Sequence, residues 1–239
     1  MKKHLWAALG PAALLALAAS TPAAAAQPTS DAPTNPILFV HGWGGTGARW
    51  DTMVDWFKGD GWPDAYLHQW TYDYHQTNLT TAKGIAAEVD KLLAATGASQ
   101  VDIVSHSMGG VSSRWYLKYL GGSSKVESWV SLGGPNHGTE NADKCSDVSC
   151  SEIRIGSDFL TALNSGDETP GTPRYATWWS ACDTVVNPRT SVLLAGAHNT
   201  QAGCLDHLGL LSDWTVYEQT RDWIEPWRNP ARARVNNAA

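Results

Sequence analysis

The sequence has 239 residues, of which 43% are hydrophobic and 17% charged, and its formal net charge is −6. An acidic chain is poorly suited to nucleic acid, because the phosphate backbone selects basic surfaces, so we expect no nucleic-acid partner. The length suits one domain with a substantial core and is short for two.

The first 26 residues have the layout of a secretory signal peptide. Two lysines precede an apolar run from Leu5 to Ala19, and Ala24-Ala25-Ala26 stand directly before Gln27. The run is too short to span a bilayer comfortably, and Pro11 further weakens the alternative of a retained membrane anchor. We therefore expect a secreted, extracellular protein with no transmembrane segment in its mature part. That part would carry 15 basic and 23 acidic residues, a net charge of −8.

Strand and helix patterns alternate along the rest of the chain. A flexible segment rich in Pro, Thr and Ser is expected at 27–35, followed by one domain over 36–239. Continuous apolar or aromatic runs predict strands, and apolar residues at helical spacing predict helices. The predicted strands are 37–40, 65–72, 101–104, 126–132, 174–179 and 191–195. The predicted helices are 50–57, 80–95 (closed by Gly97), 111–120 and 212–224 (ended by Pro226).

This alternation predicts an α/β fold with a mainly parallel sheet of about six strands and helices on both faces. In such sheets ligands bind beyond the carboxyl ends of the strands. Residues 133–173 break the pattern, with one short helical patch at 157–163. A connection of about 40 residues usually carries function or covers a site.

Ser107 lies between a predicted strand and a predicted helix, where a sharp turn would expose its hydroxyl. That turn needs small neighbours, and Gly109 and Gly110 follow the serine. Ser105 stands where the G-x-S-x-G pattern has glycine, and serine is the smallest polar substitute. We therefore expect Ser107 to be a nucleophile.

A nucleophilic serine needs a histidine base oriented by a carboxylate, and in such sheets the chain order is Ser, Asp or Glu, then His. We expect His207 to be the base, because it follows the last strand and precedes the last helix, with His198 as the alternative. We expect Asp183 to be the acid, because it comes just after strand 174–179. The competing carboxylates are Asp167, Glu168 and Asp206.

The four cysteines should form two disulfides in an exported chain, and the sequence permits three pairings. Cys182 precedes Asp183 and Cys204 stands three residues before His207, so a bond between these cysteines would tie the acid loop to the base loop. We therefore favour Cys182–Cys204 and Cys145–Cys150. A zinc site would need histidines required elsewhere, and Asp143, Asp147 and Glu152 lack a calcium-loop pattern, so we expect no metal.

An oxyanion formed by attack on a carbonyl needs backbone N–H donors already directed at it. We expect one from Met108, which follows the nucleophile at the start of a helix. The second would come from Trp43, in the glycine-rich segment 41–47 after the first strand; a simple connector is the alternative. His41 is expected to stabilise this loop rather than to act as a base.

With these residues placed, the chain resembles the α/β-hydrolase lipases over roughly 36–223, and among them the small secreted class 2 lipases of actinomycetes and bacilli. The motifs that carry this resemblance are His41-Gly42-Trp43-Gly44-Gly45, Ser105-His106-Ser107-Met108-Gly109-Gly110, Gly133-Gly134-Pro135-Asn136-His137-Gly138-Thr139, Cys182-Asp183 and His207-Leu208-Gly209-Leu210-Leu211.

The resemblance implies the same roles for Ser107, Asp183 and His207, with Trp43 and Met108 as oxyanion donors and no cofactor. It implies a secreted, monomeric serine ester hydrolase, a triacylglycerol lipase acting on acyl esters or lipids at a lipid–water interface. A short-chain, polyester or cutin-type esterase is the nearest alternative, and a non-catalytic acyl-ligand binding module is a remote one.

Overall fold

The computed structural model describes residues 35–225, so the predicted signal peptide, most of segment 27–35 and the predicted helix stop at Pro226 lie outside the described residues. Its centre is a six-stranded sheet in the order β2-β1-β3-β4-β5-β6, and every neighbouring pair is parallel. The strands are β1 (Ile37–Val40), β2 (Leu67–Trp70), β3 (Val101–His106), β4 (Val126–Leu132), β5 (Arg174–Trp179) and β6 (His198–Gln201). The α-helices are α1 (Asp51–Gly59), α2 (Asn78–Thr96), α3 (Met108–Tyr119), α4 (Val148–Glu152), α5 (Asp158–Leu163) and α6 (Trp214–Ile224).

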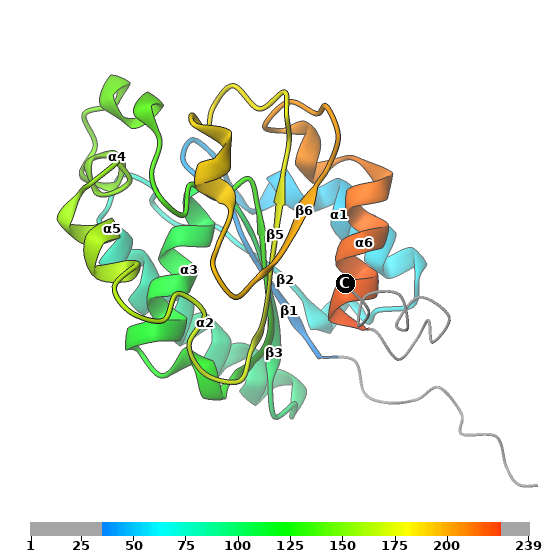
Figure 1. Ribbon diagram of the computed structural model, residues 1–239. Helices are drawn as coiled ribbons and strands as arrows, with labels where there is room; N and C mark the ends of the chain where they lie inside the picture. The colour runs from blue at the N-terminus through cyan, green and yellow to red at the C-terminus, as the bar shows by residue number, and fades with distance from the viewer. Residues whose placement is uncertain (1–34, 226–239) are drawn as a thin grey trace, which may run out of the picture. The chain divides into compact units, whose positions relative to one another are not determined.

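Helices cover both faces of this sheet (Figure 1), which confirms the predicted α/β arrangement. Successive side chains of a strand point to opposite faces, so β1 contributes to two cores. Ile37 and Phe39 pack with α1 and α6, whereas Leu38 and Val40 pack with α2 and α3. All four are fully buried, which explains why β1 reads as a continuous apolar run.

The helix ends follow local capping chemistry. The hydroxyl of Thr77 accepts a hydrogen bond of 3.0 Å from Thr80 N–H, so α2 begins earlier than the apolar periodicity predicted. Gly97 ends α2 at φ 72° as predicted. The Asp213 carboxylate accepts from Val216 N–H at 3.0 Å and starts α6 two residues later than predicted.

The sixth strand was predicted in the wrong place. Residues 191–195 are not a strand: Ser191 lies in a 3-10 helix, Arg189–Val192, and the sixth strand is β6. Val192 and Leu194 are apolar because the loop buries them, each at 1% exposure. β6 reads His-Asn-Thr-Gln and lies at the sheet edge, so hydrophobicity could not reveal it.

The β4–β5 connection, residues 133–173, folds over α3. Besides α5 it contains α4 and a 3-10 helix, Glu140–Lys144, which the sequence did not predict. Its apolar side chains form a third core with Met108 and Val111 of α3. The connection therefore packs on the helix that begins directly after Ser107. In the described part of the chain, no helix has the length and apolar character needed to cross a membrane.

Candidate active site

Ser107 occupies the tight turn between β3 and α3. Its φ and ψ are 54° and −131°, and among the described residues it is the one non-glycine residue with a positive φ. Such backbone strain costs on the order of 1–3 kcal/mol and persists only where the surrounding structure imposes it. Here Ser107 N–H donates to the Leu132 carbonyl at 3.0 Å, while Gly110 N–H donates to the Ser107 carbonyl at 2.9 Å.

Close packing explains two glycines around this turn. A Cβ at Gly109 would lie 2.5 Å from the His41 carbonyl oxygen, so α3 could not approach β1 with a larger residue there. A Cβ at Gly42 would lie 2.6 Å from Ser107 Cβ. The serine and the glycine loop are therefore in direct contact. The hydroxyl of Ser105, at the position where glycine is usual, is buried and donates to the Val130 carbonyl at 2.7 Å.

The structure brings His207 and Asp183 together. His207 Nδ1 lies 2.8 Å from Asp183 Oδ2, and both side chains are almost fully buried. Asp183 Oδ1 accepts hydrogen bonds from Val185 N–H at 2.7 Å and from Val186 N–H at 3.0 Å. Burial alone would raise the pKa of Asp183, but its hydrogen bond and charge interaction with His207 and the two backbone donors hold it below the ordinary value. Asp183 is therefore an anion at neutral pH.

A disulfide and a serine join the loops that carry this pair. The long-loop disulfide, Cys182–Cys204, spans 22 residues, and the short-loop disulfide, Cys145–Cys150, spans 5. Ser180, at the end of β5, accepts from Leu205 N–H at 2.7 Å and donates to the Leu205 carbonyl at 2.6 Å. The loops that carry Asp183 and His207 are thus held together by covalent and hydrogen bonds.

His106, which precedes Ser107, holds the loop that carries His207 from the other side. Its Nε2 lies 3.0 Å from the His207 carbonyl oxygen, and since a carbonyl only accepts, Nε2 carries the proton. Burial lowers the pKa of His106 to about 3, with a further contribution from His207, so its ring is neutral at physiological pH. The two rings are 4.5 Å apart. Sequence reasoning assigned His106 no role, although it lies inside the nucleophile motif.

The loop after β1 makes a tight turn at Trp43. Gly45 N–H donates to the Gly42 carbonyl at 3.2 Å, which leaves Trp43 and Gly44 at the corner. His41 stacks on Tyr72 at 4.1 Å and accepts from Tyr72 N–H through Nε2, so it stabilises this loop. Met108 is the first residue of α3, and helix-terminal N–H groups have no partner within the helix. Both predicted donors therefore belong to segments that converge on Ser107.

A cavity of about 540 Å³ joins these parts, and Ser107 and His207 both line it. His207 Nε2 is buried and has no hydrogen-bond partner among the described residues. This nitrogen is the one that a base would use, because Nδ1 is occupied by Asp183. The remaining wall is mainly apolar and comes from the loop after β1 (residues 41–47, here called the oxyanion loop for its predicted role), the β4–β5 connection and the loop after Asp183. Trp43, Ala142, Ile153, Val185, Val186 and Leu208 belong to it.

The competing residues have other partners. His198 lies in β6 and stacks on Trp223 at 5.1 Å. Glu168 pairs with His137 at 2.8 Å. The remaining two carboxylates each accept from a nearby backbone N–H: Asp167 from Thr169 at 2.9 Å and Asp206 from Gly209 at 2.6 Å.

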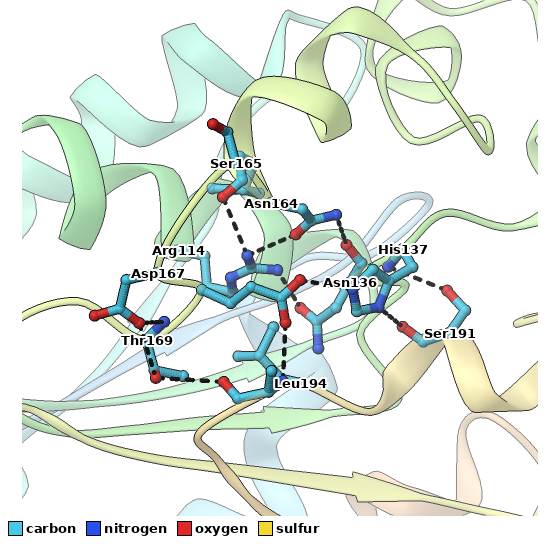
Figure 2. Close-up of polar contacts among 12 residues, drawn as sticks. Arg114, Asn136, His137, Asn164, Ser165, Asp167, Thr169, Ser191 and Leu194 are labelled. Atoms are coloured by element: carbon cyan, nitrogen blue, oxygen red, sulfur yellow. Dashed lines mark hydrogen bonds and ion pairs between the residues drawn. The ribbon is translucent and has the colours of Figure 1, made fainter.

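A buried polar network anchors the β4–β5 connection on α3 (Figure 2). Arg114 of α3 is 1% exposed and donates to the side-chain oxygens of Asn136 at 3.3 Å and of Asn164 at 2.7 Å. Asn164 in turn donates to the Asn136 carbonyl at 2.9 Å. Burial lowers the pKa of Arg114 to about 10, so the guanidinium stays charged at neutral pH. The Gly133–Thr139 motif therefore fixes one cavity wall through Asn136.

One group of potential metal ligands occurs among the described residues, formed by Cys145, Asp147 and Cys150. Both sulfurs belong to the short-loop disulfide, so neither is a thiolate. The Asp147 Oδ2 atom already contacts Trp43 Nε1 at 2.7 Å and His75 Nδ1 at 2.8 Å. The donor set does not suit a metal ion.

Known proteins resemble this chain in sequence. A family model described as Lipase (class 2) matches residues 34–202. A triacylglycerol lipase of Burkholderia plantarii is 33% identical over 150 residues, which cover 59% of this chain and 40% of that protein. The chain spans less than half the length of the curated relatives it matches.

Solved structures match the fold. The mature lipase BlEst2 of Bacillus licheniformis superposes with a TM-score of 0.71 at 19% identity, covering 81% of this chain and 93% of that one. MGS-MChE2, an alpha/beta hydrolase enzyme from a sediment metagenome of the Mar Chica lagoon in Morocco, gives a TM-score of 0.55 at 16% identity, covering 81% and 91%. The predicted α/β-hydrolase fold is confirmed.

Proposed function

Because this chain belongs to the class 2 lipase family, we propose that it is a serine ester hydrolase, a triacylglycerol lipase that cleaves carboxylic esters through an acyl-enzyme on Ser107. The observation that carries the proposal is the state of His207. Its Nδ1 is held by the buried Asp183, its buried Nε2 has no hydrogen-bond partner within residues 35–225, and His207 lines the same cavity as Ser107.

In the proposed acylation step, His207 Nε2 takes the proton from Ser107 Oγ as this oxygen bonds to the carbonyl carbon of the ester. The positive charge that develops on His207 faces Asp183, whose carboxylate stays ionised. Collapse of the tetrahedral intermediate breaks the bond to the alcohol oxygen, which receives the proton from His207. Deacylation repeats these steps with water in place of Ser107 and releases the acid.

The negative charge of the tetrahedral intermediate would be stabilised by the N–H groups of Met108 and Trp43. Each such donor is worth about 100- to 1000-fold in rate where it has been removed from other enzymes. The N-terminal end of α3 adds a favourable partial positive charge at the same place. His106 acts on the base only indirectly, through the His207 carbonyl.

The cavity suits an acyl chain. Its volume of about 540 Å³ lies in the usual range for small-molecule sites, and most of its wall is apolar. Trp43, Val185 and Leu208 line it and are 49%, 43% and 47% exposed, which gives the cavity an apolar rim. Exposed apolar groups around a site favour contact with a lipid surface. We propose acyl esters presented at a lipid–water interface as the substrate.

Export and a monomeric state complete the proposal. The two disulfides fit an oxidising compartment, in agreement with the predicted signal peptide. All the proposed site residues come from a single chain, so a monomer can carry the reaction.

The decisive experiment compares the wild type with Ser107→Ala on p-nitrophenyl esters. We expect hydrolysis to fall to the uncatalysed background in the variant while circular dichroism and melting temperature are retained. Activity that persists in Ser107→Ala would overturn the nucleophile assignment and favour a non-catalytic acyl-binding role.

A second measurement separates a lipase from the short-chain or polyester esterase alternative. The rate is followed over a series of acyl chain lengths and then on an emulsified long-chain triglyceride. A lipase hydrolyses the emulsion, whereas activity limited to short soluble esters would identify an esterase.

A further inference from the structure

We propose that Asp147 is a positioning residue for the oxyanion loop, which it holds through the indole of Trp43. The inference rests on the proposed function, because it matters only if the Trp43 N–H stabilises an oxyanion. Trp43 Nε1 donates to Asp147 Oδ2 at 2.7 Å across 104 residues of sequence. The same oxygen lies 2.8 Å from His75 Nδ1, so one carboxylate oxygen joins three separate segments.

The indole needs such a tether. Trp43 is 49% exposed and lies at the corner of the turn that Gly45 N–H closes on the Gly42 carbonyl. A side chain at a turn corner restrains the backbone only when its far end is fixed. Tyr74 fixes the ring from one side in an edge contact at 5.5 Å, and Asp147 fixes the indole N–H. Together these contacts limit rotation of the peptide whose N–H would face the oxyanion.

Asp147 is itself held in place. It lies between the two cysteines of the short-loop disulfide, directly before α4. Ser149 donates to the Tyr74 carbonyl at 2.6 Å, and Glu152 accepts from Asn78 N–H at 2.6 Å. The loop that carries Asp147 is therefore attached both to the segment before α2 and to the first residue of α2. The tether connects the oxyanion loop to a rigid part of the β4–β5 connection.

A catalytic donor must be directed at its target within a few tenths of an ångström, since a misplacement of about 1 Å can cost roughly 100-fold in rate. Loosening the loop is milder than deleting the donor, which costs about 100- to 1000-fold. Loss of the tether should therefore lower kcat by about tenfold. KM should change less than about twofold, because an oxyanion donor acts mainly in the transition state.

The test uses Asp147→Ala, which removes the acceptor, and Asp147→Asn, which keeps one oxygen. Trp43→Phe removes the indole N–H but leaves the backbone donor and an aromatic ring. We expect kcat to fall about tenfold in Asp147→Ala and Trp43→Phe, and to recover to within about threefold in Asp147→Asn. The double variant Trp43→Phe/Asp147→Ala should be no slower than the slower single variant, because both changes remove the same contact.

Asp143→Ala is the matched control. Asp143 lies in the same connection with its side chain 72% exposed and pairs with Arg154, so it loses the same charge without reaching Trp43. We expect its kcat to equal that of the wild type. Equal kcat values for Asp147→Ala and Asp143→Ala would overturn the proposal, as would effects of Asp147→Ala and Trp43→Phe that multiply. If Asp147→Ala does not fold, the same question is decided by comparing the kcat of Trp43→Phe, which loses the contact, with the kcat of Asp147→Asn, which keeps one oxygen.

The indole N–H resonance of Trp43 provides a readout that does not depend on catalysis. It is assigned by its loss in Trp43→Phe, and we expect it to shift in Asp147→Ala but not in Asp143→Ala. An unshifted resonance refutes the tether whether or not the enzyme is active. The other outcome combines a shifted resonance in Asp147→Ala with ester hydrolysis that persists in Ser107→Ala. In that case the contact exists but the proposed function has failed, and the positioning role fails with it.

Discussion

Replacing Asp183 by asparagine tests the hydrogen bond between Asp183 and His207, which would orient His207 as the proposed base. The two oxygens of Asp183 have different partners: Oδ1 accepts from the N–H groups of Val185 and Val186, and Oδ2 accepts from His207 Nδ1. An asparagine has one oxygen, and the two backbone donors will retain it. Its NH₂ group must then face His207.

The substitution therefore changes which ring nitrogen of His207 carries the proton. An NH₂ group facing Nδ1 requires this nitrogen to be an unprotonated acceptor, so the proton moves to Nε2. A protonated Nε2 cannot take the proton of Ser107. The corresponding change in a serine protease lowers kcat by about 10⁴-fold, which equals about 5.5 kcal/mol of barrier at 1.36 kcal/mol per decade. We expect a loss of the same order here, with an unchanged fold because the backbone hydrogen bonds remain.

The assay is kcat for a soluble p-nitrophenyl ester at neutral pH, with Asp206→Asn as the matched control. Asp206 precedes His207 and accepts only from Gly209 N–H among the described contacts. We expect the control to stay within about threefold of the wild type, since it leaves the base untouched. If Asp183→Asn kept more than about a tenth of the wild-type kcat, or if the control fell as far, the assigned acid would be wrong.

Three further outcomes follow from the same geometry. A Gly42→Ala methyl would lie 2.6 Å from Ser107 Cβ and would displace the serine. Because a displacement of about 1 Å costs roughly 100-fold in rate, kcat should drop by about that factor. The control Gly59→Ala, whose methyl meets no atom within 4 Å, should leave kcat unchanged. Replacing both cysteines of the long-loop disulfide by alanine should lower the free energy of unfolding by about 3.4 kcal/mol, against about 2 kcal/mol for the short-loop disulfide, and equal losses in urea denaturation would contradict this order. The pKa of Asp183 is below its ordinary value, so its stabilisation is complete above about pH 3.9 and is lost as the pH falls through the folded-state pKa; acid titration should therefore destabilise the wild type more than Asp183→Asn.

Much of the fold could be predicted because it depends on local patterns. β1 is apolar along its whole length, β3 and β4 are buried over nearly all of theirs and begin with valine, and Gly97 ends α2 as a C-terminal glycine should. β6 could not be predicted, because an edge strand has one neighbour and needs little burial. Its pairing with β5 depends on backbone hydrogen bonds that leave no hydrophobic signal.

The candidate site divides along similar lines. The predicted nucleophile, acid and base stand at strand ends, where chain order and topology restrict the choices, and the structure brings Asp183 and His207 within 2.8 Å. The contact between Trp43 and Asp147 joins residues 104 positions apart. A single half-buried aspartate in a long connection gives no periodic or motif signal, so only the three-dimensional arrangement reveals this contact.

At Ser107, the backbone conformation that lowers folding stability is the one that holds the serine hydroxyl in place. Its φ of 54° suits glycine better than any residue with a side chain, and the strain on the order of 1–3 kcal/mol comes from keeping a hydroxyl at that point. Glycine at this position would relieve this strain and would remove the proposed nucleophile. Selection for thermostability alone would therefore favour an inactive protein at this position. A selection for more stable variants must measure catalytic activity together with resistance to heating.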